Sequence, residues 1–154
     1  MPRPPRARAL LVPAACLLLT GCAWFGGDEQ SSTDVLELEV GDCVRTPTEA
    51  QVELTAVSTV PCDAEHEMEV YALVPDALDG PEAYPGADAL SAFADGACAE
   101  RFADYVGVDY RDSDLFFTYL VPSTRGWADG DTTVTCLVTT TGETLTASVA
   151  GTGR

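Results

Sequence analysis

The chain of 154 residues contains no lysine and only one histidine, and its acidic residues outnumber its basic residues 25 to 8. It therefore lacks the basic patch that binding to nucleic acid requires, and we expect no nucleic-acid partner. A membrane-spanning helix needs roughly 20 consecutive apolar residues. The apolar run near the N-terminus, Ala9–Leu19, has only eleven.

This short run has the features of an export signal. Arginines precede it, and it ends in Leu19-Thr20-Gly21-Cys22, which resembles the lipobox of bacterial lipoproteins. We expect residues 1–21 to be a lipoprotein signal peptide, cleaved so that the thiol of Cys22 carries diacylglycerol. The alternative is an ordinary signal peptide with an accidental cysteine. The lipobox interpretation places the protein on the extracytoplasmic face of the cell membrane.

The expected mature chain, residues 22–154, carries all 25 acids and five arginines, a formal charge of 5 − 25 = −20. Solubility is the simplest explanation of such acidity. The more specific alternative is a surface screened by calcium or bound to a cationic partner. We assign residues 22–34 to the lipid anchor and a flexible tether. Trp24 and Phe25 suit the membrane interface, and the polar stretch after them lacks periodicity and reaches roughly 20 Å. We assign residues 35–150 to one extracytoplasmic domain and residues 151–154 to a short tail.

Apolar periodicity predicts a small α+β domain. Alternating or β-rich runs predict five or six strands of an antiparallel sheet, at residues 35–40, 52–60, 67–74, 115–121, 132–139 and 143–149. Leu36 is out of register in the first, and Thr141-Gly142 predicts a hairpin between the last two. A single apolar stripe predicts one main helix over Ala87–Val106.

Four cysteines remain once Cys16 has left with the signal and Cys22 has taken the lipid. An even number in a small exported domain predicts two disulfides, with three connectivities. We favour Cys43–Cys62, which joins neighbouring strands, and Cys98–Cys136, which joins the buried face of the helix to a strand.

The single histidine lies in the stretch Pro61–Val70, PCDAEHEMEV. An oxidised Cys62 can be neither nucleophile nor ligand, and one histidine without paired cysteines does not supply a zinc site. We therefore expect no metal and a structural role for His66 at the edge of the core. If the stretch is extended, His66 shares the apolar face, and four carboxylates share a solvated face: Asp63, Glu65, Glu67 and Glu69.

Several short motifs, taken in order, are similar to the septum-formation-related domain of actinobacterial envelope proteins. They are GDCV at residues 41–44, PCxxxHxxEV at residues 61–70, YPG at residues 84–86 before the helix, and WxxGDxxVxC at residues 127–136. The resemblance covers residues 39–149 and implies a role near the division septum. Family members often place proline before the histidine, where this chain has Glu65.

No residue pattern indicates a reaction or a cofactor, so we expect a non-enzymatic module that binds an envelope or division protein. The alternative is a binder of cell-wall polymer, with Trp127 and the aromatic residues 116–119 as a stacking surface. Residues 115–121 would more often form a buried central strand, and Trp127 is as plausible a lid over the core as an exposed side chain. A hydrolase hidden among the 25 acids is the weakest alternative.

Overall fold

The computed structural model describes residues 30–47, 54–80 and 82–154. The predicted signal peptide, Cys22 and most of the predicted tether lie outside these ranges. The elements in chain order are β1 (Ser31–Asp34), the 3-10 helix η1 (Val35–Glu37), β2 (Cys43–Arg45), β3 (Ala56–Val60), β4 (Met68–Val74), η2 (Ala77–Asp79), α1 (Ala87–Val106), β5 (Phe116–Leu120), α2 (Thr124–Ala128) and β6 (Val134–Thr139).

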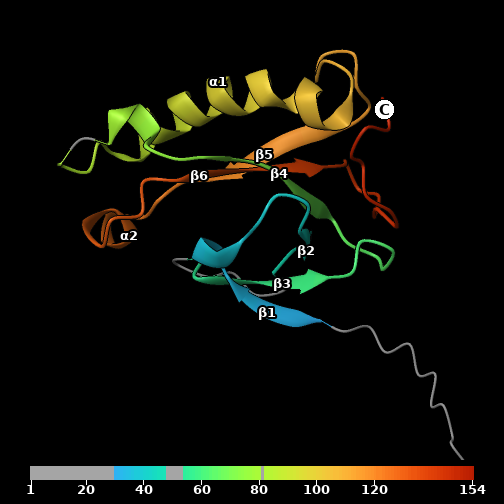
Figure 1. Ribbon diagram of the computed structural model, residues 1–154, viewed down its shortest axis with the longest axis horizontal. Coiled ribbons are helices and arrows are strands. Elements are labelled where there is room, and N and C mark those ends of the chain that lie inside the picture. The colour runs from blue at the N-terminus through green and yellow to red at the C-terminus, as the bar shows by residue number, and fades with distance from the viewer. Residues whose placement is uncertain (1–29, 48–53, 81) are drawn as a thin grey trace, which may run out of the picture.

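The strands form one antiparallel sheet in the order β1-β3-β2-β4-β6-β5, and α1 packs across its β4, β6 and β5 part (Figure 1). The predicted α+β class, with six strands and one main helix, is confirmed. Within the described residues, no helix combines the length and the apolar character needed to cross a membrane.

Helix α1 has the predicted bounds because its sequence marks both ends. Pro85-Gly86 precedes it, and Gly107 follows in the left-handed conformation, with a φ of 95° and its N–H bonded to Ala103 O. The backbone of Gly153 lies 3.6 Å from where a Cβ of Gly107 would be. That separation is an ordinary contact, so glycine suits this position because of its positive φ.

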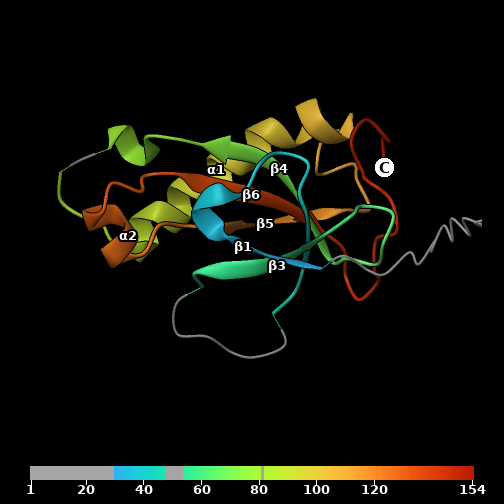
Figure 2. The same ribbon diagram turned by 60° about the horizontal axis from the view of Figure 1, so that its bottom comes forward.

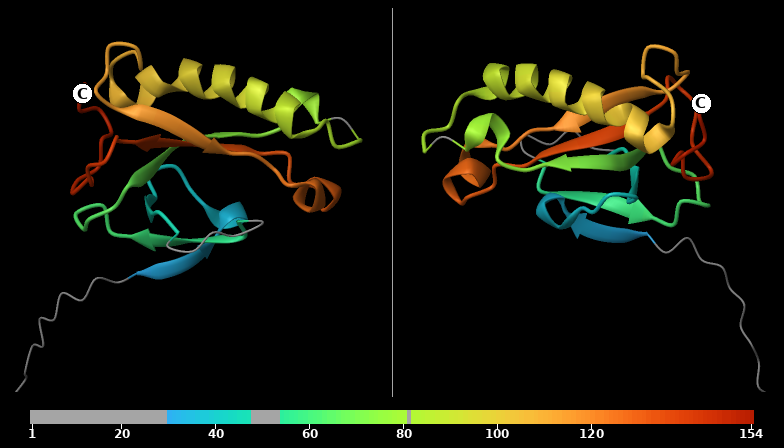
Figure 3. Two further views of the ribbon diagram at one scale, coloured as in Figure 1. Left: turned by 180° about the vertical axis from the view of Figure 1, so that it is seen from behind. Right: turned by 45° about the horizontal axis from the view of Figure 1, so that its top comes forward.

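The sheet is covered on both faces. The α1 face carries the larger core, in which Phe102 and Leu90 of the helix are fully buried. On the opposite face the β1, β2 and β3 end of the sheet turns beneath β4 and β6 (Figures 2 and 3). A second, smaller core fills the space between them, built from Leu38, Val44, Val57, Val70 and Leu137. The central strand β4 therefore has little contact with solvent on either side.

A β-bulge in β4 adjusts its alternation to these two cores. The pairing of β4 with β6 shifts register between Val70 and Ala72. As a result Tyr71 and Ala72, which are consecutive, both belong to the α1 core, whereas Val70 and Leu73 face the smaller core. A bulge inserts one extra residue and so reverses the side-chain alternation of the strand beyond it.

The N-terminal elements differ from the sequence prediction. Residues 31–34, assigned to the tether, form β1 and pair with β3, with the hydroxyls of Thr33 and Thr59 2.7 Å apart. The predicted strand at residues 35–40 is wrong, because η1 begins there with the Asp34 side chain accepting from Leu36 N. A carboxylate at this position favours a helical turn over continued extension. The ordered domain therefore includes Ser31–Asp34.

The C-terminal prediction also needs correction. Residues 143–149 do not form a strand or a hairpin, although Leu145 and Val149 are buried in the α1 core. The residues assigned to a short tail are hydrogen-bonded to the end of α1. Gly151 N and Gly153 N donate to Tyr105 O and Val106 O, both at 2.8 Å. The tail thus satisfies carbonyls that the last turn of a helix leaves without intrahelical donors.

The aromatic strand β5 is not the central strand that we expected. It lies at the end of the sheet and pairs only with β6 among the described strands. Phe117 packs against Phe102 of α1, whereas Phe116 is 50% exposed. The interior positions belong to β3, β2, β4 and β6. The predicted strands at residues 67–74 and 132–139 are confirmed with trimmed ends.

Both predicted disulfides are confirmed, Cys43–Cys62 with a sequence separation of 19 and Cys98–Cys136 with a separation of 38. The first attaches β2 to the turn that precedes β4. The second attaches the middle of α1 to β6, and both of its sulfur-bearing residues are fully buried.

We expect replacement of either pair by alanine to lower the free energy of unfolding. The chain-entropy treatment gives about 3 kcal/mol for Cys43–Cys62 and about 4 kcal/mol for Cys98–Cys136, because the longer loop loses more entropy on closure. Urea denaturation of the two double variants beside the oxidised wild type measures both values. Midpoints equal to that of the wild type would contradict the expectation.

Candidate functional site

Pro61–Glu65, the first half of the stretch that contains the single histidine, is a turn and not an extended strand. His66 follows it and forms a single β-bridge with Leu145, through N–H···O contacts of 3.0 and 2.7 Å. The His66 side chain is 0% exposed, and its Nδ1 lies 2.8 Å from Ala64 O. Its Nε2 is buried without a hydrogen-bond partner among the described residues.

Three residues further on, Glu69 is also 0% exposed, although it carries a carboxylate. Tyr105 of α1 and Ser148 donate their hydroxyls to Oε1, at 2.5 and 2.6 Å, and Val149 N donates to Oε2 at 2.8 Å. Three donors can compensate for taking a carboxylate out of water. Glu69 thus links β4 to the last turn of α1 and to the C-terminal segment.

Burial of Glu69 overturns the expectation of a solvated face with four carboxylates. That expectation assumed a sheet covered on one side only. Because β4 has a core on each face, a residue that alternates away from the smaller core meets α1 and not water. Asp63 and Glu65 remain exposed in the turn. The structural role predicted for His66 agrees with its buried position and its backbone contacts.

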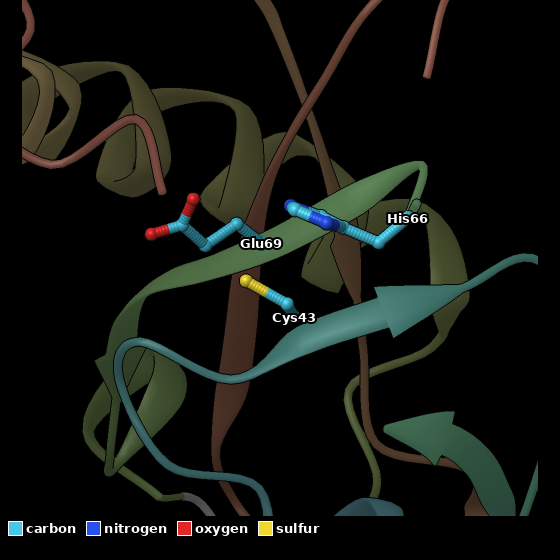
Figure 4. A group of neighbouring side chains, drawn as sticks. All are labelled: Cys43, His66 and Glu69. Carbon is cyan, nitrogen blue, oxygen red and sulfur yellow. The ribbon is translucent and has the colours of Figure 1, made fainter. Parts of the chain in front are cut away.

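The polar atoms of Cys43, His66 and Glu69 all lie within 4.8 Å of one another. The imidazole of His66 points toward the other two side chains (Figure 4). Cys43 is oxidised, so its sulfur is no thiolate ligand. Two remaining groups are fewer than the three or four protein ligands of a zinc site. In this redox state the cluster holds the C-terminal segment and does not fit a metal centre.

The environment of Glu69 affects its neighbour Tyr105. Burial, followed by the hydrogen bond to Glu69 and its negative charge, raises the pKa of Tyr105 to about 12, although the hydrogen bond to Ser148 acts in the opposite direction. An ionised phenol beside a buried carboxylate would be repelled and poorly solvated. Tyr105 therefore stays protonated and can donate to Glu69 across the neutral pH range.

A groove of about 600 Å³ lies on the sheet face opposite α1. It adjoins the smaller core. Its walls combine the end of β1 and η1, the ends of β5 and β6, and the start of α2. The apolar lining residues include Val35, Leu36, Leu54, Leu73, Leu120 and Val121. Leu36 is 65% exposed at this site, a large apolar area for a solvent-facing side chain.

The charged residues that line the groove are mainly acidic. Asp34, Asp129 and Asp131 carry negative charge there, and Arg125 is the cation among the lining residues. Asp34 and Asp131 also accept backbone N–H groups, from Leu36 and Thr133. These bonds fix the carboxylates at the rim of an apolar surface. Pockets that bind other molecules commonly combine an apolar lining with a few fixed polar groups.

Trp127 lies in α2 with only 6% of its surface exposed, and its ring meets Tyr84 edge to face with centroids 6.0 Å apart. Of the two alternatives for this residue, the structure therefore supports the lid over the core. The exposed aromatic side chains of the described residues are Phe116 and Tyr110. Trp127 is consequently unavailable as a stacking platform for a sugar ring.

The groove and the partners of Glu69 were not identified from the sequence. One signal was available, because the out-of-register Leu36 is among the apolar side chains that line the groove. Tyr105 and Ser148 gave no such signal, since they lie 36 and 79 residues from Glu69. The predicted lipidation site, Cys22, lies outside the described residues.

We expect Glu69→Gln to lower the free energy of unfolding by about 2 kcal/mol, because the amide keeps the volume but loses charge-assisted hydrogen bonds. Glu65→Gln is the matched control, since Glu65 is exposed, and its effect should stay within about 0.5 kcal/mol. Chemical denaturation measures both. Equal losses in the two variants would show that the three bonds to Glu69 contribute little.

Tyr105 should make stability fall at high pH. Its folded pKa, about 12, exceeds the ordinary value of 10.0 that applies to the unfolded chain. The unfolded state therefore loses its proton first, so stability from this group is complete below pH 10 and declines as the pH rises toward 12. Tyr105→Phe should be less stable at pH 7 and should show a shallower decline from pH 10 to 12.

Thermal unfolding at a series of pH values measures this difference. Tyr71, whose pKa burial also raises, remains in the variant and accounts for a residual decline. An unchanged slope in Tyr105→Phe would contradict the assignment.

Comparisons with known proteins agree with the sequence motifs. Two curated proteins, from Mycobacterium tuberculosis and Mycobacterium bovis, both named "Putative lipoprotein LppN", are 32% identical over 117 residues, which is 73% of this chain. The chain spans 62% of the length of each. No solved structure matches it significantly. The sequence profile described as Septum formation matches residues 27–136, and the chain therefore belongs to the Septum formation family.

Proposed function

We propose that this protein is a lipid-anchored, extracytoplasmic binding module of the cell envelope with a role in septum formation, and that it has no enzymatic activity. The groove between η1, the end of β5 and α2 is the observation that carries the proposal. The lipobox-like sequence at Leu19–Cys22 and the name of the mycobacterial relatives support anchoring through Cys22.

The groove suits binding because its apolar lining is reachable from solvent. A soluble domain seldom exposes a large apolar patch without a use for it. Leu36, at 65% exposure, would lose much of its contact with water if a partner covered it. Apolar area that is removed from water stabilises a complex by roughly 25 cal/mol per Å², before the costs of association.

The position of the buried polar cluster supports a non-enzymatic role. Glu69 and His66 are each 0% exposed and contact the C-terminal segment, so neither faces a surface that a substrate could reach. A general acid or base must come within hydrogen-bond distance of the reacting atom. The acids of the groove, by contrast, are fixed at its rim beside apolar side chains, an arrangement suited to orienting a bound chain.

In-cell photo-crosslinking of the anchored protein tests the proposal. With p-benzoylphenylalanine at Leu36, we expect reproducible capture of one envelope or division protein, because this position lies in the groove. The same probe at Ala92, on the exposed side of α1, is the matched control and should capture none. Cys22→Ala should remove the lipid anchor and strongly reduce the capture at Leu36.

Two outcomes would contradict the proposal. Equal capture from Leu36 and Ala92 would show that the groove is not the binding surface. No protein capture, combined with sedimentation of the purified domain on peptidoglycan, would favour the polymer-binding alternative. That sedimentation should then depend on the exposed ring of Phe116, since Trp127 is buried.

A further inference from the structure

Strand β5 has a free backbone edge beside the groove. It ends the sheet, and β6 is its only partner within the part of the chain that the structure describes. An edge strand presents N–H and C=O groups that can pair with another extended chain. The last residue of β5, Leu120, and the residue after it, Val121, both line the groove. The free edge and the apolar groove are therefore continuous.

The side chains of β5 divide between the two faces of the sheet. Phe117 and Tyr119 pack against the α1 core, so one face of the strand is already covered. Leu120 packs against the smaller core on the other face. Phe116 and Thr118 share that second face by alternation, and both are exposed. A chain added to β5 would thus meet an open apolar surface on the groove side only.

The negative charge of the domain determines which kind of chain could pair with β5. The described residues include 21 acids, which is the total of 25 less Asp28, Glu29, Glu49 and Glu53, against five arginines. Two of these arginines form ion pairs with acids on the loop before β5, Arg111 with Asp109 and Arg154 with Asp114. A second copy of this chain would bring the same negative charge to the interface and be repelled.

We propose that β5 and the groove bind an extended segment of a partner protein that carries lysine or arginine together with alternating apolar side chains. This proposal rests on the binding role proposed above and names the chemistry of the partner. The segment pairs with the free edge of β5 as a seventh strand. Its apolar side chains enter the groove beside Leu36 and Leu120, and its cationic side chains lie near Asp34 and Asp129.

In this binding mode, the backbone and the side chains contribute differently to recognition. Main-chain hydrogen bonds to an edge strand give affinity with little dependence on sequence, and pockets for alternate side chains give specificity. The acidic rim adds attraction that falls as salt increases, because the Debye length shortens from about 10 Å at 0.1 M to about 3 Å at 1 M. Binding should therefore be weaker at high salt.

The test uses a phage-displayed random dodecapeptide library selected on the oxidised domain, followed by affinity measurement with the enriched peptides. We expect enriched peptides to be cationic with alternating apolar residues. Leu36→Asn, which removes the apolar side chain without adding charge, should weaken their binding at least tenfold. Val40→Asn is the matched control, because Val40 is 51% exposed but does not line the groove, and binding should be unchanged.

Charge and strand addition are tested separately. Asp129→Lys should weaken binding several-fold, whereas Asp63→Lys, in the exposed turn before His66, should have a much smaller effect. On peptide binding, the backbone amides of β5 should exchange more slowly with solvent. Those of the other edge strand, β1, should not change. The thermal midpoint of each variant without peptide shows whether it is folded.

Three outcomes would each overturn the proposal. They are enrichment of acidic or uncharged peptides, equal weakening by Leu36→Asn and Val40→Asn, and slower exchange at β1 without any change at β5. The wider binding role has its own test in the cell. If crosslinking at Leu36 captures an envelope protein through a helical or acidic segment, the strand-addition proposal fails and the binding role stands. If cationic peptides bind β5 but Leu36 captures no protein in the cell, the chemistry assigned to β5 and the groove stands, and the binding role in the envelope fails.

Discussion

The fold depends on a carboxylate that is removed from water. Glu69 accepts hydrogen bonds from Tyr105, Ser148 and Val149, and these three residues belong to parts of the chain that no strand pairing connects. Without that acceptor, the C-terminal segment would lose the hydrogen bonds that hold Ser148 and Val149 to β4. A buried charge with fully satisfied bonds is specific, because a displaced partner leaves the charge uncompensated.

The two disulfides join other elements than the hydrogen bonds of Glu69 do, although Cys43 lies beside Glu69. Cys98–Cys136 fixes α1 to β6, and Cys43–Cys62 fixes β2 to the turn before β4. The two faces of the sheet differ in how completely they are covered. The face under α1 is closed by a continuous core, whereas the opposite face has a smaller core that gives way to the groove. The open surface of the domain therefore lies opposite its helix.

Helix α1 and the disulfides could be predicted because each depends on local or countable features. The helix has a regular apolar stripe with glycine at both ends, and four cysteines in an exported domain leave few connectivities. Strand β1 could not be predicted, since Ser31–Asp34 has no apolar alternation and forms only by pairing with β3. The burial of Glu69 could not be predicted either, because its donors lie 36 to 80 residues away. It also depends on a sheet that is covered on both faces.

The order of the strands sets how the domain would respond to tension. Strand β1 follows the predicted lipid anchor, and β5 lies at the other end of the sheet. A pull between the membrane and a chain held at β5 would load every interstrand ladder between them. The short β2–β4 ladder, with two paired positions, is then the mechanical weak point of the sheet. Covalent attachment of β2 to the turn before β4, through Cys43–Cys62, limits how far that ladder could open.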